Sequence, residues 1–243
     1  MTILAMVPGR IGSTRLKMKN LALLGGRPLM SYAIEAAKAS GVFDQIIVNG
    51  DHPVFEQIAA SHGVCCYLRP PELGSSTTTS DAVVYDFMMK HPADVVAWVN
   101  PTSPLQTGEE IRSVVRHFQA QTLDSLITVK EERVHGLVNG TPVNFEPDAP
   151  FAQTQDLPPL QLFVYSVMMW RTATFKRAFE AHGYALLSGT VGYFSVSKLS
   201  GLLIKTPEDL QIVEGLLQAR RHGTSSSVRY DPLVQELMKG VEA

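Results

Sequence analysis

Short apolar runs alternate with longer segments of helical periodicity along most of the 243-residue chain. A short apolar run indicates a buried strand, and apolar residues recurring at helical spacing indicate a helix that covers a sheet. The runs predict strands over residues 2–7, 45–48, 64–68, 95–99, 125–129, 163–169, 193–196 and 202–204. The periodic segments predict helices over residues 28–40, 52–62, 80–90, 109–119, 172–181 and 207–220. Strands and helices alternating in this way form right-handed βαβ units, so we expect an α/β protein with a doubly wound sheet.

The alternation weakens between residues 130 and 162, where long periodic elements are absent. Five prolines fall in this stretch: Pro142, Pro147, Pro150, Pro158 and Pro159. We interpret it as an insertion that leaves the sheet, as a lid or a dimer contact. In a dimer, its physical basis would be mutual burial of the apolar residues Leu157, Leu160, Leu162 and Phe163. Residues 1–222 then form one domain, and residues 223–243 add a flexible joint at 223–227 and a short helix.

Composition narrows the classes of function. The formal net charge of -2 and the lack of a dense basic run argue against nucleic-acid binding. No apolar stretch reaches the roughly 18 residues that a membrane span needs. The two cysteines, Cys65 and Cys66, are adjacent, so they provide neither a disulfide framework nor a zinc site. We therefore expect a cytoplasmic protein in a reducing compartment.

The loop after the first predicted strand, residues 8–21, is rich in glycine and cations. In a doubly wound sheet it lies at the carboxyl edge, where ligands bind. Arg10 and Arg15 can fork onto phosphate oxygens, and Lys17 and Lys19 add mobile point charges. The loop is neither a P-loop nor a dinucleotide fingerprint. It predicts a triphosphate site, and the alternative is a solvated basic surface loop.

Two further polar segments follow predicted strands, at residues 69–80 and 100–105. In the first, Arg69, several hydroxyls and the backbone could read a base edge. Ser80 is a natural N-cap for the next helix, so the alternative is capping and turn chemistry alone. Because the carboxyl ends of parallel strands meet at one edge, three such loops together favour a binding site.

The segments GRIGSTRLKMKNL, LRPPELGSSTTTS, NPTSPLQTGEEI and TPEDL, in this order, resemble the CMP-sugar-acid synthetases, the cytidylyltransferases for sialic acid and related nonulosonic acids. The resemblance spans roughly residues 3–218. It implies a Rossmann-like α/β/α nucleotidyltransferase fold for the domain of residues 1–222, with about 130–162 as a protruding dimerisation segment. It implies an enzyme that joins CTP to a sugar acid with Mg²⁺, giving a CMP-sugar and pyrophosphate. It also implies a homodimer whose ligands are CTP and a small acidic sugar.

The resemblance assigns roles to the nucleotide half of the site. Arg10 and Lys19 match the family's triphosphate-binding residues, and Ser13 falls in the same loop. Cytidine-binding positions are matched by Asn20, Arg69 and Ser80. The family usually has Gln, near both substrates, where this chain has Asn100. Asn can still donate and accept hydrogen bonds, but it is one methylene shorter.

The metal and acceptor half departs from the family pattern. The family's D-I-D-T, whose aspartates hold Mg²⁺, is replaced by Leu203-Ile204-Lys205-Thr206, so the metal ligands are unknown. Where the family has R-Q-x-L-P, this chain keeps Gln155 but has Thr154 in place of the Arg. A second Arg of the family, farther downstream, is replaced by Leu162, and the family's N-G-A is replaced by Val164-Tyr165-Ser166. The candidate acceptor-binding residues are Asn100, Gln155 and Tyr165.

Three hypotheses follow from this split. The first is an active cytidylyltransferase in which Arg10, Lys19 and Lys205 are catalytic. In that enzyme Lys205 would neutralise phosphate charge directly. Alternatively, Mg²⁺ would be held by the triphosphate, water and a carboxylate such as Asp51. Lys205 could equally be a surface lysine ahead of a helix. The second hypothesis is a non-catalytic homologue that binds CTP or a CMP-sugar. The third is a nucleotidyltransferase for another acceptor, such as a phosphonate, or for another base.

Overall fold

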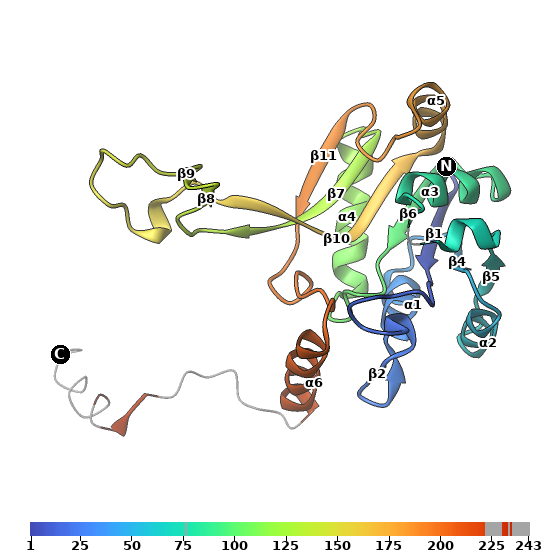
Figure 1. Ribbon diagram of the computed structural model, residues 1–243, viewed down its shortest axis with the longest axis horizontal. Coiled ribbons are helices and arrows are strands. Elements are labelled where there is room, and N and C mark those ends of the chain that lie inside the picture. The colour runs from blue at the N-terminus through green and yellow to red at the C-terminus, as the bar shows by residue number, and fades with distance from the viewer. Residues whose placement is uncertain (76, 222–229, 233, 235–243) are drawn as a thin grey trace.

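The computed structural model describes residues 1–75, 77–221, 230–232 and 234. Within these residues, seven strands form the central sheet in the order β11-β7-β10-β6-β1-β4-β5 (Figure 1). The strands are β1 (Ile3–Pro8), β4 (Gln45–Gly50), β5 (Cys65–Leu68), β6 (Val95–Val99), β7 (Ser125–Glu132), β10 (Leu160–Arg171) and β11 (Val191–Ser195). All pair in parallel except β10, which runs antiparallel to β6 and β7.

Helices cover both faces of the sheet and enclose two apolar cores. One core joins α1 (Leu29–Ser40), α2 (Val54–Ser61) and α4 (Gly108–Ala120) to the strands. The other joins α3 (Ser80–Lys90) and α5 (Thr172–His182) to the opposite face. The predicted doubly wound α/β/α architecture is therefore confirmed.

Helix α6 (Pro207–Arg221) packs beside the loop that follows β1 rather than on the main sheet faces. Its residue Val213 shares a third apolar cluster with Leu24, Leu29 and Ile204. The prediction of a strand over residues 202–204 is wrong. These residues join no strand pair, and their apolar character reflects this packing, with Ile204 fully buried.

The segment around residues 130–162 does leave the sheet, as the long arm in Figure 1. Its base is more regular than expected, because β7 and β10 continue into it as an antiparallel pair that aligns Glu132 with Leu160. Near its tip lie β8 (Leu137–Val138), β9 (Thr141–Pro142) and a 3-10 turn at Thr154–Asp156. Leu157 is already buried within one chain, whereas Leu162 and Phe163 are exposed.

The described residues also form several shorter elements. They are β2 (Leu23–Leu24), β3 (Arg27–Pro28) and 3-10 turns at Lys19–Leu21 and Pro71–Gly74. In the part that the structure describes, no helix combines the length and the apolar character needed to cross a membrane. The predicted joint at 223–227 lies outside the described residues, as does most of the segment expected to form the short terminal helix.

Candidate active site

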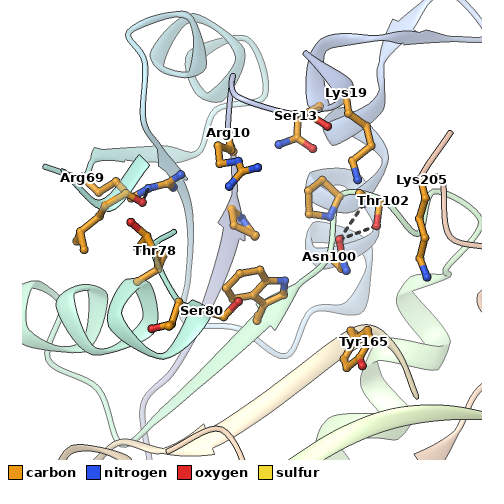
Figure 2. Close-up of a pocket in the computed structure, with 18 of the residues that line it drawn as sticks. Arg10, Ser13, Lys19, Arg69, Thr78, Ser80, Asn100, Thr102, Tyr165 and Lys205 are labelled. Atoms are coloured by element: carbon orange, nitrogen blue, oxygen red, sulfur yellow. Dashed lines mark hydrogen bonds between the residues drawn. The ribbon is translucent and has the colours of Figure 1, made fainter. Parts of the chain in front are cut away.

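A cavity of about 490 Å³ opens at the carboxyl edge of the sheet, between the loops that follow β1, β5 and β6 (Figure 2). Tyr165 from β10 and Leu203 and Lys205 ahead of α6 close its far side. The three polar loops predicted to share one edge therefore form one site. Every predicted site residue except Gln155 lines it: Arg10, Ser13, Lys19, Asn20, Arg69, Ser80, Asn100, Tyr165 and Lys205.

The loop after β1 is held close to the neighbouring strand before it turns around the cavity. The Gly9 N–H donates to the Asn49 carbonyl at 2.8 Å, and a Cβ at Gly9 would meet the Phe55 ring at 2.8 Å. Glycine is therefore required for this approach. Farther along, Met18 adopts a left-handed φ of 48° and starts the 3-10 turn that presents Lys19 and Asn20 to the cavity.

Cations converge on this part of the cavity. Burial lowers the pKa of Lys19, and the charges of Arg15, Arg10 and Lys205 lower it further, in that order. These cations therefore lie near Lys19 without full compensation of its charge by anionic groups. An anion bound among them would relieve this repulsion, which is the electrostatic signature of a phosphate site.

Arg69 mainly fixes the second loop. Its buried guanidinium donates from Nη1 to the Asn49 carbonyl at 2.6 Å and from Nε to the Leu73 carbonyl at 3.2 Å. Its Nη2 lies 3.6 Å from Asp51 Oδ2. Burial lowers the pKa of Arg69, and the carboxylate of Asp51 opposes that effect. Arg69 lines the cavity, but these contacts occupy most of its donors, so the rest of the loop offers more for a base.

Asp51 joins the loops after β1, β4 and β5. Besides facing Arg69, its Oδ1 accepts the Ile11 N–H at 3.0 Å. A Cβ at Gly74 would lie 3.1 Å from Asp51, so the second loop also packs tightly against it. Asp51 does not line the cavity, and its carboxylate is committed to these contacts.

The prediction that Ser80 caps α3 is wrong. The N-cap is Thr79, whose Oγ1 accepts the Ala82 N–H at 3.2 Å. Ser80 is the first residue of the helix and lines the cavity. Its hydroxyl is therefore not used for N-capping.

Asn100 is oriented by its own loop. Its Oδ1 accepts hydrogen bonds from Thr102 N–H at 3.0 Å and Thr102 Oγ1 at 2.9 Å, the contacts dashed in Figure 2. The amide oxygen is thus engaged, and the amide NH₂ is left for the cavity. Asn100 therefore presents donors to a ligand rather than both donors and acceptors.

Trp98 is a cavity residue that the sequence reading missed. It lies on β6 two residues before Asn100, which follows the end of the strand, and both residues line the cavity. Its indole Nε1 is buried and has no hydrogen-bond partner among the described residues. In the sequence, the feature that could have indicated this role is Trp98 itself, a single amphipathic side chain near the carboxyl end of an otherwise aliphatic strand.

Tyr165 reaches the cavity from an irregularity in β10. The pairing with β7 shifts register between Phe163 and Met168, and Tyr165 adopts a left-handed φ of 54°. This conformation is costly for a non-glycine residue and is common at functional sites. The Asn100 N–H donates to the Ser166 carbonyl at 2.9 Å, which brings Tyr165 beside Asn100.

Lys205 enters the cavity from a braced segment. The Ile204 N–H donates to the Thr102 carbonyl at 2.8 Å. The N–H groups of Lys205 and Thr206 both donate to Asp209 Oδ2 at 2.8 Å. Burial opposes ionisation of Asp209, but these hydrogen bonds outweigh it and lower its pKa. Figure 2 shows the ammonium of Lys205 on the side of the cavity where Asn100 and Tyr165 lie.

Gln155 does not join the site within one chain. It lies in the 3-10 turn of the arm, where its Nε2 donates to Gln153 Oε1 at 2.6 Å. Its carbonyl accepts from Arg133 at 3.3 Å. The structure of one chain therefore does not bring Gln155 to this cavity, because the arm carries it away from the sheet edge.

The donor set of the cavity does not fit a protein-held Mg²⁺. No Asp or Glu of the described residues lines it. The part of the chain that the structure describes also holds no group of three His, Cys, Asp or Glu side chains able to bind a metal. Mg²⁺ requires oxygen ligands and usually one or two carboxylates. The nearby Asp51 and Asp209 are engaged in loop and capping contacts.

Solved structures share this fold. A CMP:2-keto-3-deoxy-manno-octonic acid synthetase complexed with CTP superimposes with a TM-score of 0.69 at 15% identity, over 90% of this chain and 100% of that chain. Bifunctional IspDF from Campylobacter jejuni superimposes with a TM-score of 0.63 at 13% identity, over 87% of this chain and 54% of that chain. These likenesses support the nucleotidyltransferase fold.

Sequence comparison identifies the family. N-acylneuraminate cytidylyltransferase of Streptococcus agalactiae is 28% identical over 135 residues, which are 54% of this chain and 33% of that protein. CMP-N,N'-diacetyllegionaminic acid synthase of Legionella pneumophila is 36% identical over 121 residues, 47% of this chain and 52% of that protein. The chain thus spans about a third to a half of the length of these relatives. The sequence model of the cytidylyltransferase family matches residues 4–156, and the chain therefore belongs to this family, as its resemblance to the CMP-sugar-acid synthetases predicted.

Proposed function

We propose that this chain is a cytoplasmic cytidylyltransferase that transfers CMP from CTP to a nonulosonic or related sugar acid. The observation that supports this most directly is the convergence of Arg10, Arg15, Lys19 and Lys205 on one cavity at the carboxyl edge of the sheet. Such a cluster matches the charge of a triphosphate. The family match and the names of the relatives favour cytidine as the base.

In the proposed reaction, an oxygen of the acceptor attacks the α-phosphorus of CTP. A new oxygen–phosphorus bond forms, the bond from the α-phosphorus to the bridging oxygen breaks, and pyrophosphate leaves with that electron pair. If the attacking group is a hydroxyl, its proton passes to solvent. The chain would contribute positioning and charge stabilisation, chiefly through Arg10 and Lys19.

The acceptor half offers hydrogen-bond donors. The Asn100 amide presents its NH₂ group to the cavity because Thr102 engages its oxygen. The Tyr165 hydroxyl adds a group that can donate or accept. Hydrogen-bond donors on this side of the cavity favour an acidic acceptor, such as a sugar carboxylate. A phosphonate would satisfy the same donors.

The test is pyrophosphate release from CTP by the purified chain, against sialic, legionaminic, pseudaminic and Kdo-type acids and small phosphonates. We expect release with one sugar acid, and none without an acceptor. Release only with a phosphonate would keep the transferase and change its acceptor. Release from another nucleotide but not from CTP would contradict the proposal.

A non-catalytic nucleotide-binding protein is the second candidate, and the lack of carboxylates along the described cavity wall favours it. Calorimetry on the same sample separates the two. Tight CTP binding without release from any acceptor, with Mg²⁺ or Mn²⁺ present, would support the non-catalytic protein. Acceptor-dependent release would exclude it.

A further inference from the structure

The cavity presents cations where a metal-dependent site would need anionic ligands. Its described lining includes the five cationic side chains Arg10, Arg15, Lys19, Arg69 and Lys205, and no carboxylate. A divalent cation placed against this wall would meet repulsion from the protein and would find no carboxylate there, only neutral oxygens, the nucleotide and water. The wall itself is therefore built for a highly charged anion.

The two nearest carboxylates are not free to change this balance. Asp51 faces Arg69 and accepts the Ile11 N–H, outside the cavity lining. Asp209 accepts two backbone N–H groups at the start of α6. Releasing either to bind a metal would leave buried or capping donors without a partner, which is costly.

Lys205 is held where its charge acts on the phosphate-binding cations. Its backbone is braced by Asp209, and the preceding residue, Ile204, donates to the Thr102 carbonyl. Its ammonium lies close enough to contribute to the lowered pKa of Lys19. The backbone of Lys205 is therefore fixed while its side chain is exposed, and together with the half-buried Lys19 it offers two ammonium charges to one anion.

We propose that Lys205 supplies the charge neutralisation for which a related site would use a protein-held metal ion, so that the chain binds CTP as the free, metal-free nucleotide. This inference rests on the proposed use of CTP and goes beyond it. Mg²⁺ bound to CTP reduces the negative charge of the nucleotide. A cationic wall without carboxylates should therefore bind free CTP more tightly than its Mg²⁺ complex.

The test is calorimetric titration of the full chain with CTP, once with EDTA and once with excess Mg²⁺. We expect tight binding in EDTA and a several-fold weaker affinity in Mg²⁺. Lys205→Met should weaken binding in EDTA by about tenfold or more, because one close cation is lost. Lys198→Met, which removes an exposed lysine outside the cavity, is the matched control and should bind like the parent chain.

A double variant tests the same idea in the opposite direction. Leu203→Asp with Lys205→Asp would introduce two carboxylates at the cavity wall. Its CTP affinity in EDTA should fall by more than about tenfold, and Mg²⁺ should now restore part of it. Circular dichroism of each variant shows whether it is folded.

The outcomes separate the two proposals. CTP binding by the parent chain only when Mg²⁺ is present would overturn the inference and leave the cytidylyltransferase proposal intact. Unchanged binding by folded Lys205→Met in EDTA would also overturn it. Absence of CTP binding under both conditions would overturn the inference and the proposed function together.

Discussion

At the residue scale, the site consists of charges whose surroundings assign them different tasks. Lys19 is half-buried among other cations, which lowers its pKa, and it is poised for an anion. Arg69 is also cationic, but carbonyl groups and Asp51 surround it, so its main contribution is to the loop. The sequence alone lists both as cations and cannot separate these tasks, because the difference depends on which backbone atoms the fold brings near each.

The lowered pKa of Lys19 predicts a pH dependence of CTP binding. The phosphates stabilise the protonated ammonium, so affinity is greatest while Lys19 is charged in the free protein. Above the lowered pKa of Lys19, the protein must take up a proton when it binds CTP. Affinity should therefore begin to fall at a pH below 10.5, the ordinary pKa of a lysine. Calorimetry in buffers of different ionisation enthalpy would detect this uptake. Lys19→Met should lack the alkaline proton uptake, and an unchanged profile would exclude Lys19.

Trp98 gives an optical prediction. The chain has two tryptophans, and Trp170 is fully buried in the core, whereas Trp98 lines the cavity. CTP binding should therefore change the fluorescence of Trp98 and leave that of Trp170 nearly constant. Trp98→Phe should remove most of the response while calorimetry still detects binding. A response that persists in this variant would show that the ligand does not occupy the wall formed by Trp98.

At the element scale, the position of the site follows from the order of strands and loops. Apolar runs and helical periodicity predicted the layers, and loops after β1, β5 and β6 met at one edge as expected. The antiparallel direction of β10 was not predictable from its apolar pattern, because that pattern is the same in both directions. The left-handed Tyr165 was also hidden, because it depends on the register shift of β10 against β7. The donor-only Asn100 was hidden because it depends on hydrogen bonds from Thr102 within its own loop.

The buried pair of Arg69 and Asp51 connects these elements and predicts a stability effect. Arg69→Met would leave the Asp51 carboxylate, whose side chain is 9% exposed, and the Asn49 carbonyl without their partner. Unfolding in urea should show a loss of about 3 kcal/mol in the free energy of unfolding. Arg27→Met is the comparison, because Arg27 pairs with Glu35 at the surface and should cost about 1 kcal/mol or less. Equal losses for the two variants would contradict a structural role for Arg69.

At the scale of the whole molecule, the arm is the feature least explained by one chain. It carries β8, β9 and Gln155 away from the sheet. Near its base, the exposed rings of Phe163 and Tyr193 contact each other, with ring centroids 5.7 Å apart. The prolines predicted that the segment would protrude, but the extension of β7 and β10 into it was missed because exposed arm strands lack the continuous apolar pattern of core strands.

The arm predicts a homodimer in solution. Light scattering should give twice the mass of one chain, because Leu162 and Phe163 are exposed on β10 and would be buried by a partner. Leu162→Asp with Phe163→Asp should shift the mass to that of a monomer while circular dichroism stays unchanged. A monomeric parent chain would contradict this prediction.

The central claim is that the cationic cavity transfers CMP from CTP to an acidic acceptor. Phosphorus-31 NMR of the chain with CTP and each sugar acid follows reactant and both products at once. We predict that one acceptor gives pyrophosphate and a new CMP ester in equal amounts. CTP that stays intact with every acceptor, or pyrophosphate accompanied only by free CMP, would contradict the claim.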